Sequence, residues 1–180
     1  MLFYASHHRK IQGPSFRCAT HLQGPSYHGL CQGNLFNVLN SYVDWDEGPV
    51  ALDLFAGTGS ITLELLSRGC SRVISIEKDR LHYGFIKGFL DKLGDEAGLP
   101  VCGDVFKYLS RCHEQFDIVF ADPPYQLENL ADIPDIVLDH GLLREEGLLV
   151  LEHGKTHDFS AHPRFVEHRA WGSVNFSFFK

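Results

Sequence analysis

Short apolar runs alternate with longer amphipathic segments along most of this 180-residue chain. Residues 50–55, 72–77, 116–121 and 147–152 are rich in Val, Ile, Leu and Phe, as buried strands are. Residues 61–66, 81–93, 105–112 and a segment beginning near Pro134 space their apolar side chains as helices do. Strands that alternate with helices predict a mostly parallel sheet with helices on both faces.

Both ends of the chain depart from this alternation. Phe165–Arg169 and Val174–Phe179 alternate apolar and polar residues around Trp171-Gly172-Ser173, which predicts an antiparallel hairpin. Residues 1–33 scatter Gly, Pro, Ser and His without any apolar face. We therefore expect an irregular N-terminal arm at 1–33 and a single domain at 34–180.

The four residues Asp122-Pro123-Pro124-Tyr125 follow the apolar run 116–121 directly. Two prolines in succession end a strand, because each lacks a backbone N–H and has a fixed φ. In open α/β sheets the carboxyl ends of the strands are where ligands bind. A carboxylate, free carbonyls and an aromatic ring there suit a flat ring that carries an amino group. The alternative from these residues alone is a turn with a surface tyrosine.

A glycine turn follows the first predicted strand. Asp53-Leu54-Phe55 leads into Ala56-Gly57-Thr58-Gly59-Ser60 and then into a helical pattern. Strand, glycine turn and helix together form a nucleotide cradle, because glycines let a ligand approach the backbone and the helix start offers free N–H groups. The spacing is not G-x-G-x-x-G, so a dinucleotide phosphate site is poorly supported.

Acidic residues end the next two predicted strands. Glu77 ends 72–77, where a carboxylate suits the two hydroxyls of a ribose, and Asp104 ends a short strand at Val101–Val105, placed to meet an adenine amino group. A single acid at a strand end is more often a helix cap, as Asp79 and Asp104 could be. Several in series beside a glycine turn favour one shared crevice instead.

These motifs, in this order, resemble those of the class I S-adenosylmethionine-dependent methyltransferases. The stretches 53–59, Leu66-Ser67-Arg68-Gly69 and 116–125 resemble the RsmD family more closely, from Leu35 to the end of the chain. The resemblance implies a Rossmann-like, mostly parallel seven-stranded sheet with a C-terminal antiparallel hairpin. It also implies methyl transfer from S-adenosylmethionine to the N2 amine of one guanine in small-subunit (16S) ribosomal RNA.

The resemblance also assigns roles to residues. Asp122 and the Pro123 carbonyl would accept the two amine hydrogens of a flipped-out base that stacks on Tyr125. Asp53 would support the glycine turn. The expected catalytic set is Asp122, Pro123, Pro124 and Tyr125, and the expected cofactor set is Asp53, Phe55, Ala56, Gly57, Thr58, Gly59, Glu77, Lys78, Asp104 and Val105.

Composition fits a cytoplasmic enzyme. No apolar run reaches the length of a membrane span, and the five cysteines have no C-x-x-C spacing, so we expect reduced thiols and neither a membrane nor a leader segment. Glu152, His153 and His157 do not share a helix face, and we expect no metal. A monomer is expected. The net charge of −7 is unfavourable for an RNA partner and fits a small methyl acceptor better.

Two other classes of function stay open. A methyltransferase acting on adenine N6 in DNA or another RNA would use nearly the same motif, although we expect no added target-recognition domain here. A catalytically impaired nucleotide-binding module would not need the residues at 122–125.

The N-terminal arm lacks the basic hairpin and the R-P-T…K-E segment of the family, yet Asn34-Leu35-Phe36-Asn37 matches the family at once. Codons for Pro25–Asn34, read one nucleotide later, permit R-P-T-T-D-F-A-K-E joined directly to N-L-F-N. Our hypothesis is a frameshift near Asn34 in the gene or its record, which would also have removed positive charge.

Overall fold

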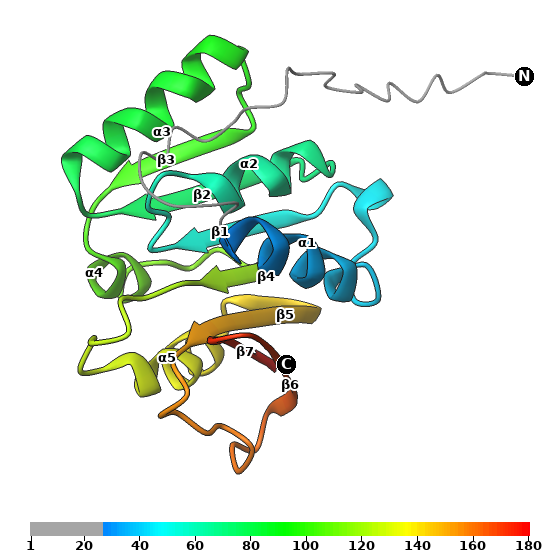
Figure 1. The fold of residues 1–180 in the computed structure, drawn as a ribbon. Coiled ribbons are helices and arrows are strands. Elements are labelled where there is room, and N and C mark those ends of the chain that lie inside the picture. Colours follow the sequence, from blue (N-terminus) through cyan, green and yellow to red (C-terminus); the bar gives the residue numbers. More distant parts are fainter. Residues whose placement is uncertain (1–26) are drawn as a thin grey trace, which may run out of the picture.

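The computed structural model describes residues 27–180 and, within them, side chains from Gly33 onward. Seven strands form one sheet in the order β3-β2-β1-β4-β5-β7-β6 (Figure 1). The strands are β1 (Val50–Leu54), β2 (Arg72–Glu77), β3 (Gly98–Cys102), β4 (Phe116–Ala121), β5 (Leu143–His153), β6 (Phe165–Trp171) and β7 (Val174–Phe179). The helices are α1 (Tyr27–Leu39), α2 (Ser60–Ser67), α3 (Arg80–Leu93), α4 (Val105–Leu109) and α5 (Ile133–Asp139), with 3-10 turns η1 (Trp45–Glu47) and η2 (Leu130–Asp132).

The sheet is parallel from β3 to β5 and antiparallel where β7 pairs with β5 and β6. The strand order reverses between β1 and β4, so their carboxyl ends flank the switch point where ligands bind in open α/β sheets. The predicted mostly parallel seven-stranded sheet with a C-terminal hairpin is confirmed.

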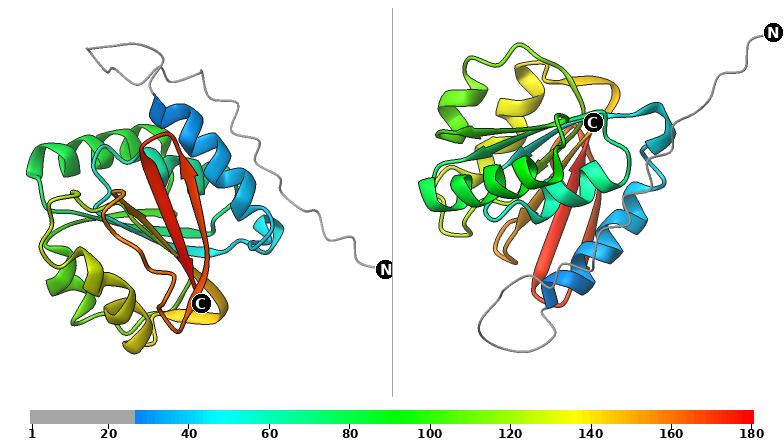
Figure 2. Two further views of the ribbon diagram at one scale, coloured as in Figure 1. Left: turned by 60° about the horizontal axis from the view of Figure 1, so that its bottom comes forward. Right: turned by 90° about the horizontal axis from the view of Figure 1, so that it is seen from above.

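Helices cover both faces of the sheet. Apolar side chains of α1, α2 and α3 pack with one face in a core that includes Leu35, Leu65 and Ile86. Those of α4 and α5 pack with the other face through residues such as Leu109 and Val137. Figure 2 shows α1 lying beside the β6–β7 hairpin, where the ring of Tyr42, just after the helix, stacks on Phe178 at a centroid distance of 6.1 Å. Because β1 to β4 are parallel, the connections that lead from these strands into the next helix all lie at the carboxyl ends of the strands.

The third strand lies earlier in the chain than the sequence indicated. β3 covers Gly98–Cys102, so Asp104 lies beyond the strand and caps α4. Pro100 is tolerated in β3 because this strand forms one edge of the sheet, where an N–H can be missing. The prediction of a strand at 101–105 was therefore wrong by a few residues.

Helix α1 begins inside the segment that the sequence predicted to be irregular. It runs from Tyr27 to Leu39, so the expected boundary at residue 33 falls within a helix. Leu35, Phe36 and Leu39 are buried in the core. The rest of the predicted arm, residues 1–26, lies outside the described residues.

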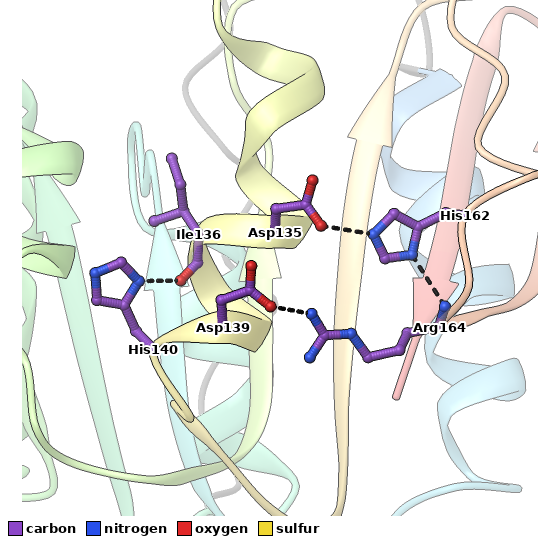
Figure 3. A network of polar contacts seen from close by, with 6 residues as sticks. All are labelled: Asp135, Ile136, Asp139, His140, His162 and Arg164. Carbon is purple, nitrogen blue, oxygen red and sulfur yellow. Dashed lines mark hydrogen bonds and ion pairs between the residues drawn. The ribbon is translucent and has the colours of Figure 1, made fainter.

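Polar contacts fasten α5 to the segment that precedes β6 (Figure 3). Asp135 Oδ1 lies 3.0 Å from Nε2 of His162, and Asp139 pairs with the guanidinium of Arg164. The backbone N–H of Arg164 donates to Nδ1 of His162 at 3.1 Å. The connection between β5 and β6 is thereby tied to α5.

None of the helices between Tyr27 and Lys180 has the length and apolar content needed to cross a membrane.

Candidate active site

The glycine turn after β1 has an unusual backbone. Phe55, Gly57 and Gly59 all have positive φ, at 62°, 54° and 81°. At Gly59 a Cβ would lie 2.9 Å from Cγ1 of Ile86, so both conformation and packing against α3 require glycine. At Gly57 a Cβ would meet only the carbonyl oxygen of Phe55, at 3.9 Å. The turn is therefore packed on its α3 side and open at Gly57, where a ligand can approach the backbone.

Glu77 holds this turn from the end of β2. Its Oε2 accepts a 2.7 Å hydrogen bond from the backbone N–H of Gly57, and its Oε1 accepts one of 2.6 Å from the backbone N–H of Asp79. The side chain is buried. A carboxylate has about four lone-pair sites, so each oxygen can accept a further bond from a ligand hydroxyl. The expected ribose role of Glu77 stays a prediction that this geometry permits.

Asp53 lies in β1, just before the turn. Its carboxylate accepts a 2.6 Å hydrogen bond from the hydroxyl of Thr62, which also lies 2.6 Å from the hydroxyl of Ser75. This chain links β1, α2 and β2 through three buried polar side chains. Burial raises the pKa of Asp53 to about 7, against the hydrogen bonds from Thr62 and with a smaller contribution from the charge of Glu77.

The remaining predicted cofactor residues lie at the ends of β2 and β3. Asp104 accepts a 3.1 Å hydrogen bond from the N–H of Lys107, so it is a helix cap. The sequence had allowed this simpler role for an acid near a strand end. Val105 is the first residue of α4 and its side chain is buried in the core. Lys78 is exposed. Contact of these residues with an adenine stays a prediction.

The predicted acceptor residues lie beside the glycine turn. Leu54 pairs with Ala121 across β1 and β4, and the N–H of Asp122 donates to the carbonyl of Leu54 at 3.3 Å. The chain therefore leaves both strands at adjacent points, one toward Phe55 and the other toward Asp122. Pro123 is buried, whereas Pro124 and Tyr125 are exposed.

Glu152 also belongs to this group, although its place in the sequence suggested only a possible metal ligand. It is 6% exposed, and its Oε1 accepts a 2.8 Å hydrogen bond from the hydroxyl of Tyr125. Its carboxyl group also lies close enough to that of Asp122 for a side-chain hydrogen bond. The rule that selected Glu77 would have selected Glu152 too, because its position is near the carboxyl end of β5.

Electrostatics show that these acids converge. Burial is the main reason why the pKa of Asp122 rises to about 8, and the charges of Glu152 and Asp53 add to it. The structure thus brings Asp53, Asp122 and Glu152 together with the glycine turn, while Glu77 closes the turn from β2.

Three imidazoles lie close together, from His153 at the end of β5, His157 after it and His168 in β6. His153 is buried, with ring centroids 6.2 Å from His157 and 5.9 Å from His168. Its Nε2 lies 2.8 Å from the hydroxyl of Ser177, and burial lowers its pKa. Among residues 27–180, no group of three or more His, Cys, Asp or Glu side chains is arranged to hold a metal ion.

The arrangement has known counterparts. Residues 28–180 match the family model described as "Conserved hypothetical protein 95", a match that starts before Leu35. The chain is 30% identical over 126 residues to "Putative rRNA methyltransferase YlbH" of Bacillus subtilis, covering 68% of this chain and 67% of that protein. It is 30% identical over 122 residues to "Ribosomal RNA small subunit methyltransferase D" of Haemophilus influenzae, covering 66% of this chain and 62% of that protein.

A solved structure agrees with these relatives. "Putative methyltransferase yhhF" from Escherichia coli superimposes with a TM-score of 0.74 at 26% identity, covering 84% of each chain. The alignments span about two thirds of the length of YlbH and a little less of the Haemophilus protein. With its seven-stranded sheet, glycine turn and acids at the strand ends, the chain belongs to the Conserved hypothetical protein 95 family, as an RsmD-like protein with the class I methyltransferase fold.

Proposed function

We propose that this protein transfers a methyl group from S-adenosylmethionine to the exocyclic N2 amine of a guanine in the RNA of the small ribosomal subunit. The observation that carries the proposal is the adjacency of Asp122 to the turn Phe55–Gly59. A methyl donor bound at the turn and an amine bound at Asp122 would meet where β1 and β4 end. The printed names of the two relatives support RNA as the substrate class.

The cofactor is expected to bind over the open side of the turn. Gly57 offers backbone that no side chain shields, and Glu77 offers carboxylate oxygens for ribose hydroxyls. We expect Lys78, Asp104 and Val105, which follow β2 and β3 in the chain, to meet the adenine. S-adenosylmethionine, when bound, supplies a methyl group made electrophilic by its sulfonium.

The acceptor amine is expected to lie between Asp122 and the ring of Tyr125. The Asp122 carboxyl group and the Pro123 carbonyl oxygen would accept its two N–H hydrogens and orient its nitrogen toward the methyl group. These hydrogen bonds favour the pyramidal nitrogen of the transition state over the flat amine of the ground state. Tyr125 is 46% exposed, so its ring has an accessible surface for stacking with a base.

Few cationic side chains of the described domain are available to bind RNA phosphates. Many cations of the described domain are paired with carboxylates, among them Arg72, Arg144 and Lys180. Lys155 is exposed and follows Gly154. Gly154 lies beside Tyr125, since a Cβ added to it would be 3.8 Å from the tyrosine ring. We expect Lys155 to contact a phosphate close to the target base. We further propose that the protein acts as a monomer in the cytoplasm.

The test is methylation of defined RNA. Purified protein is incubated with S-adenosylmethionine and either small ribosomal subunits or naked small-subunit RNA from cells that lack the gene, and nucleosides are analysed by mass spectrometry. N2-methylguanosine at one site is expected, and Asp122→Ala protein should give none. N6-methyladenosine, or methylation of DNA instead of RNA, would replace the proposal with the adenine alternative. Binding of S-adenosylmethionine without transfer to any substrate would favour the impaired module.

A further inference from the structure

Asp122 comes directly after β4 and Glu152 lies in β5, so both are at the carboxyl ends of adjacent parallel strands. Ala121 pairs with Leu151 in the register of β4 and β5, so the next residue of each strand bears a carboxyl group. Glu152 is buried and Asp122 is largely covered. The two carboxyl groups lie close enough for a side-chain hydrogen bond between them.

A hydrogen bond between two carboxyl groups requires a proton on one of them, because ionised carboxylates only accept. Burial, together with the neighbouring charges of Glu152 and Asp53, raises the pKa of Asp122 to about 8. Near neutral pH the pair therefore holds one proton and one negative charge, as carboxyl dyads do. The hydroxyl of Tyr125 donates to the same Glu152, at 2.8 Å.

We propose that Glu152 is a positioning residue of the acceptor site, which shares a proton with Asp122 and orients the ring of Tyr125. The inference rests on the proposed methyl transfer. In it, Asp122 and Glu152 act as a pair that shares one proton. Glu152 joins the group that would accept the amine hydrogens to the ring on which the base would stack.

The pair also accounts for the proton that the reaction releases. The amine nitrogen forms a bond to the methyl carbon with its lone pair, and the carbon–sulfur bond breaks with its electrons left on sulfur. The methylated nitrogen is then positively charged and strongly acidic, since its lone pair no longer conjugates with the ring. Asp122 takes this proton while the shared proton lies on Glu152, and the pair then returns one proton to water.

Substitutions of Glu152 separate its two contacts. Glu152→Gln keeps an oxygen that can accept from Tyr125, but it removes the acid that shares a proton with Asp122. Glu152→Ala removes both contacts. Glu167→Gln is the matched control, because Glu167 accepts a 2.9 Å hydrogen bond from Tyr42 in a second tyrosine–glutamate pair.

The first readout uses the protein without substrate. Infrared titration should show a protonated carboxyl group that ionises near pH 8 in the wild type and in Glu167→Gln. In Glu152→Gln that component should move to a lower pH, because the charge and the hydrogen bond of Glu152 are lost while the effect of burial remains. The component from Asp53 serves as an internal reference. An unchanged titration in Glu152→Gln overturns the inference, whatever the substrate of the enzyme.

The second readout is kinetic. Wild-type kcat should fall above about pH 8, because two adjacent ionised carboxylates repel each other, and this fall should be absent in Glu152→Gln. The KM for RNA should be near normal in Glu152→Gln and raised about tenfold or more in Glu152→Ala, which loses the orientation of Tyr125. Equal effects of the two substitutions on KM would contradict the positioning of Tyr125. A normal infrared result with no RNA methylation would reject the proposed function and leave the proton-sharing pair intact.

Discussion

The backbone N–H of Gly57 donates a 2.7 Å hydrogen bond to Oε2 of Glu77, so the end of β2 holds the turn that follows β1. The same carboxylate accepts from the N–H of Asp79, at the start of α3. One acidic side chain thus fixes two connections, the one from β1 to α2 and the one from β2 to α3.

Glu77→Ala should weaken binding of S-adenosylhomocysteine about ten- to a hundredfold, since hydrogen bonds to charged groups contribute roughly 1.5–3 kcal/mol. The turn loses its partner and the ribose loses its expected acceptor. Titration calorimetry measures the effect. Glu64→Ala, which removes an acid paired with Arg68 on the surface of α2, should bind as the wild type does. Equal affinities in the two variants would exclude the cofactor role of Glu77.

Asp122→Ala should reduce kcat for methyl transfer about a hundredfold or more, since it removes an acceptor for the amine in the transition state. Affinity for S-adenosylhomocysteine should stay nearly intact, because Asp122 is expected to contact the acceptor. Asp132→Ala, an exposed acid in η2, is the control for loss of charge. Near-normal turnover by Asp122→Ala would assign the amine to another residue.

Tyr125→Ala should weaken use of the RNA substrate by about 1–3 kcal/mol, the usual contribution of one stacked base. Tyr125→Phe retains the stacking surface and loses only the hydrogen bond to Glu152. We therefore expect the Phe variant to lie between the wild type and the Ala variant in kcat/KM. If both substitutions had the same effect, the hydroxyl contact rather than stacking would be the contribution of this residue.

The free energy of unfolding should fall as pH rises from about 4 to about 7. Asp53 ionises near its ordinary pKa of 3.8 when unfolded, whereas burial raises its folded pKa to about 7, so only the folded state keeps the proton within this window. Each unit of pKa difference contributes roughly 1.4 kcal/mol.

Urea unfolding near pH 5 and pH 8 checks this dependence. Asp53→Asn should show a smaller loss of stability between the two values, with the remainder due to Asp122, whose pKa is raised in the same direction. The exposed Asp91→Asn should keep the full dependence. A wild-type protein that gains stability over this range would refute the assignment.

The frameshift hypothesis predicts the codons of the gene. They should be compatible with R-P-T-T-D-F-A-K-E in the next frame across Pro25–Asn34, although the family match in the given frame already begins at residue 28. The arm as given carries only Arg9, Lys10 and Arg17. Restoring the shifted frame should therefore raise RNA affinity and its salt dependence without changing cofactor binding. Incompatible codons would end the hypothesis.

Periodicity located the central strands because burial on both faces leaves a simple signal. The run 116–121 was predicted with the bounds that β4 has. One crevice shared by the serial acids stays a prediction. β3 was misplaced because an edge strand tolerates Pro100, which reads as a break when neighbours are unknown. α1 was missed because nothing in the residues before Asn34 repeats at helical spacing.

The partners of the site residues could not be predicted from spacing. Glu152 is distant from Asp122 in sequence, and only the register of β4 against β5 brings the two together. Asp104 shows the opposite case, because its contact with Lys107 is local and capping was a foreseeable role. Local chemistry can be inferred from short segments, whereas a shared proton depends on pairing between strands.

The packing of α1 against β7 affects how this protein folds during synthesis. Leu35 and Phe36 lie in the same core as Phe176 and Phe178, although the two segments are at opposite ends of the described chain. β7 also inserts between β5 and β6. The first helix therefore cannot complete its packing until the last strand has left the ribosome, and such distant contacts slow folding. Until then the part of the apolar face of α1 that packs with β7 stays uncovered.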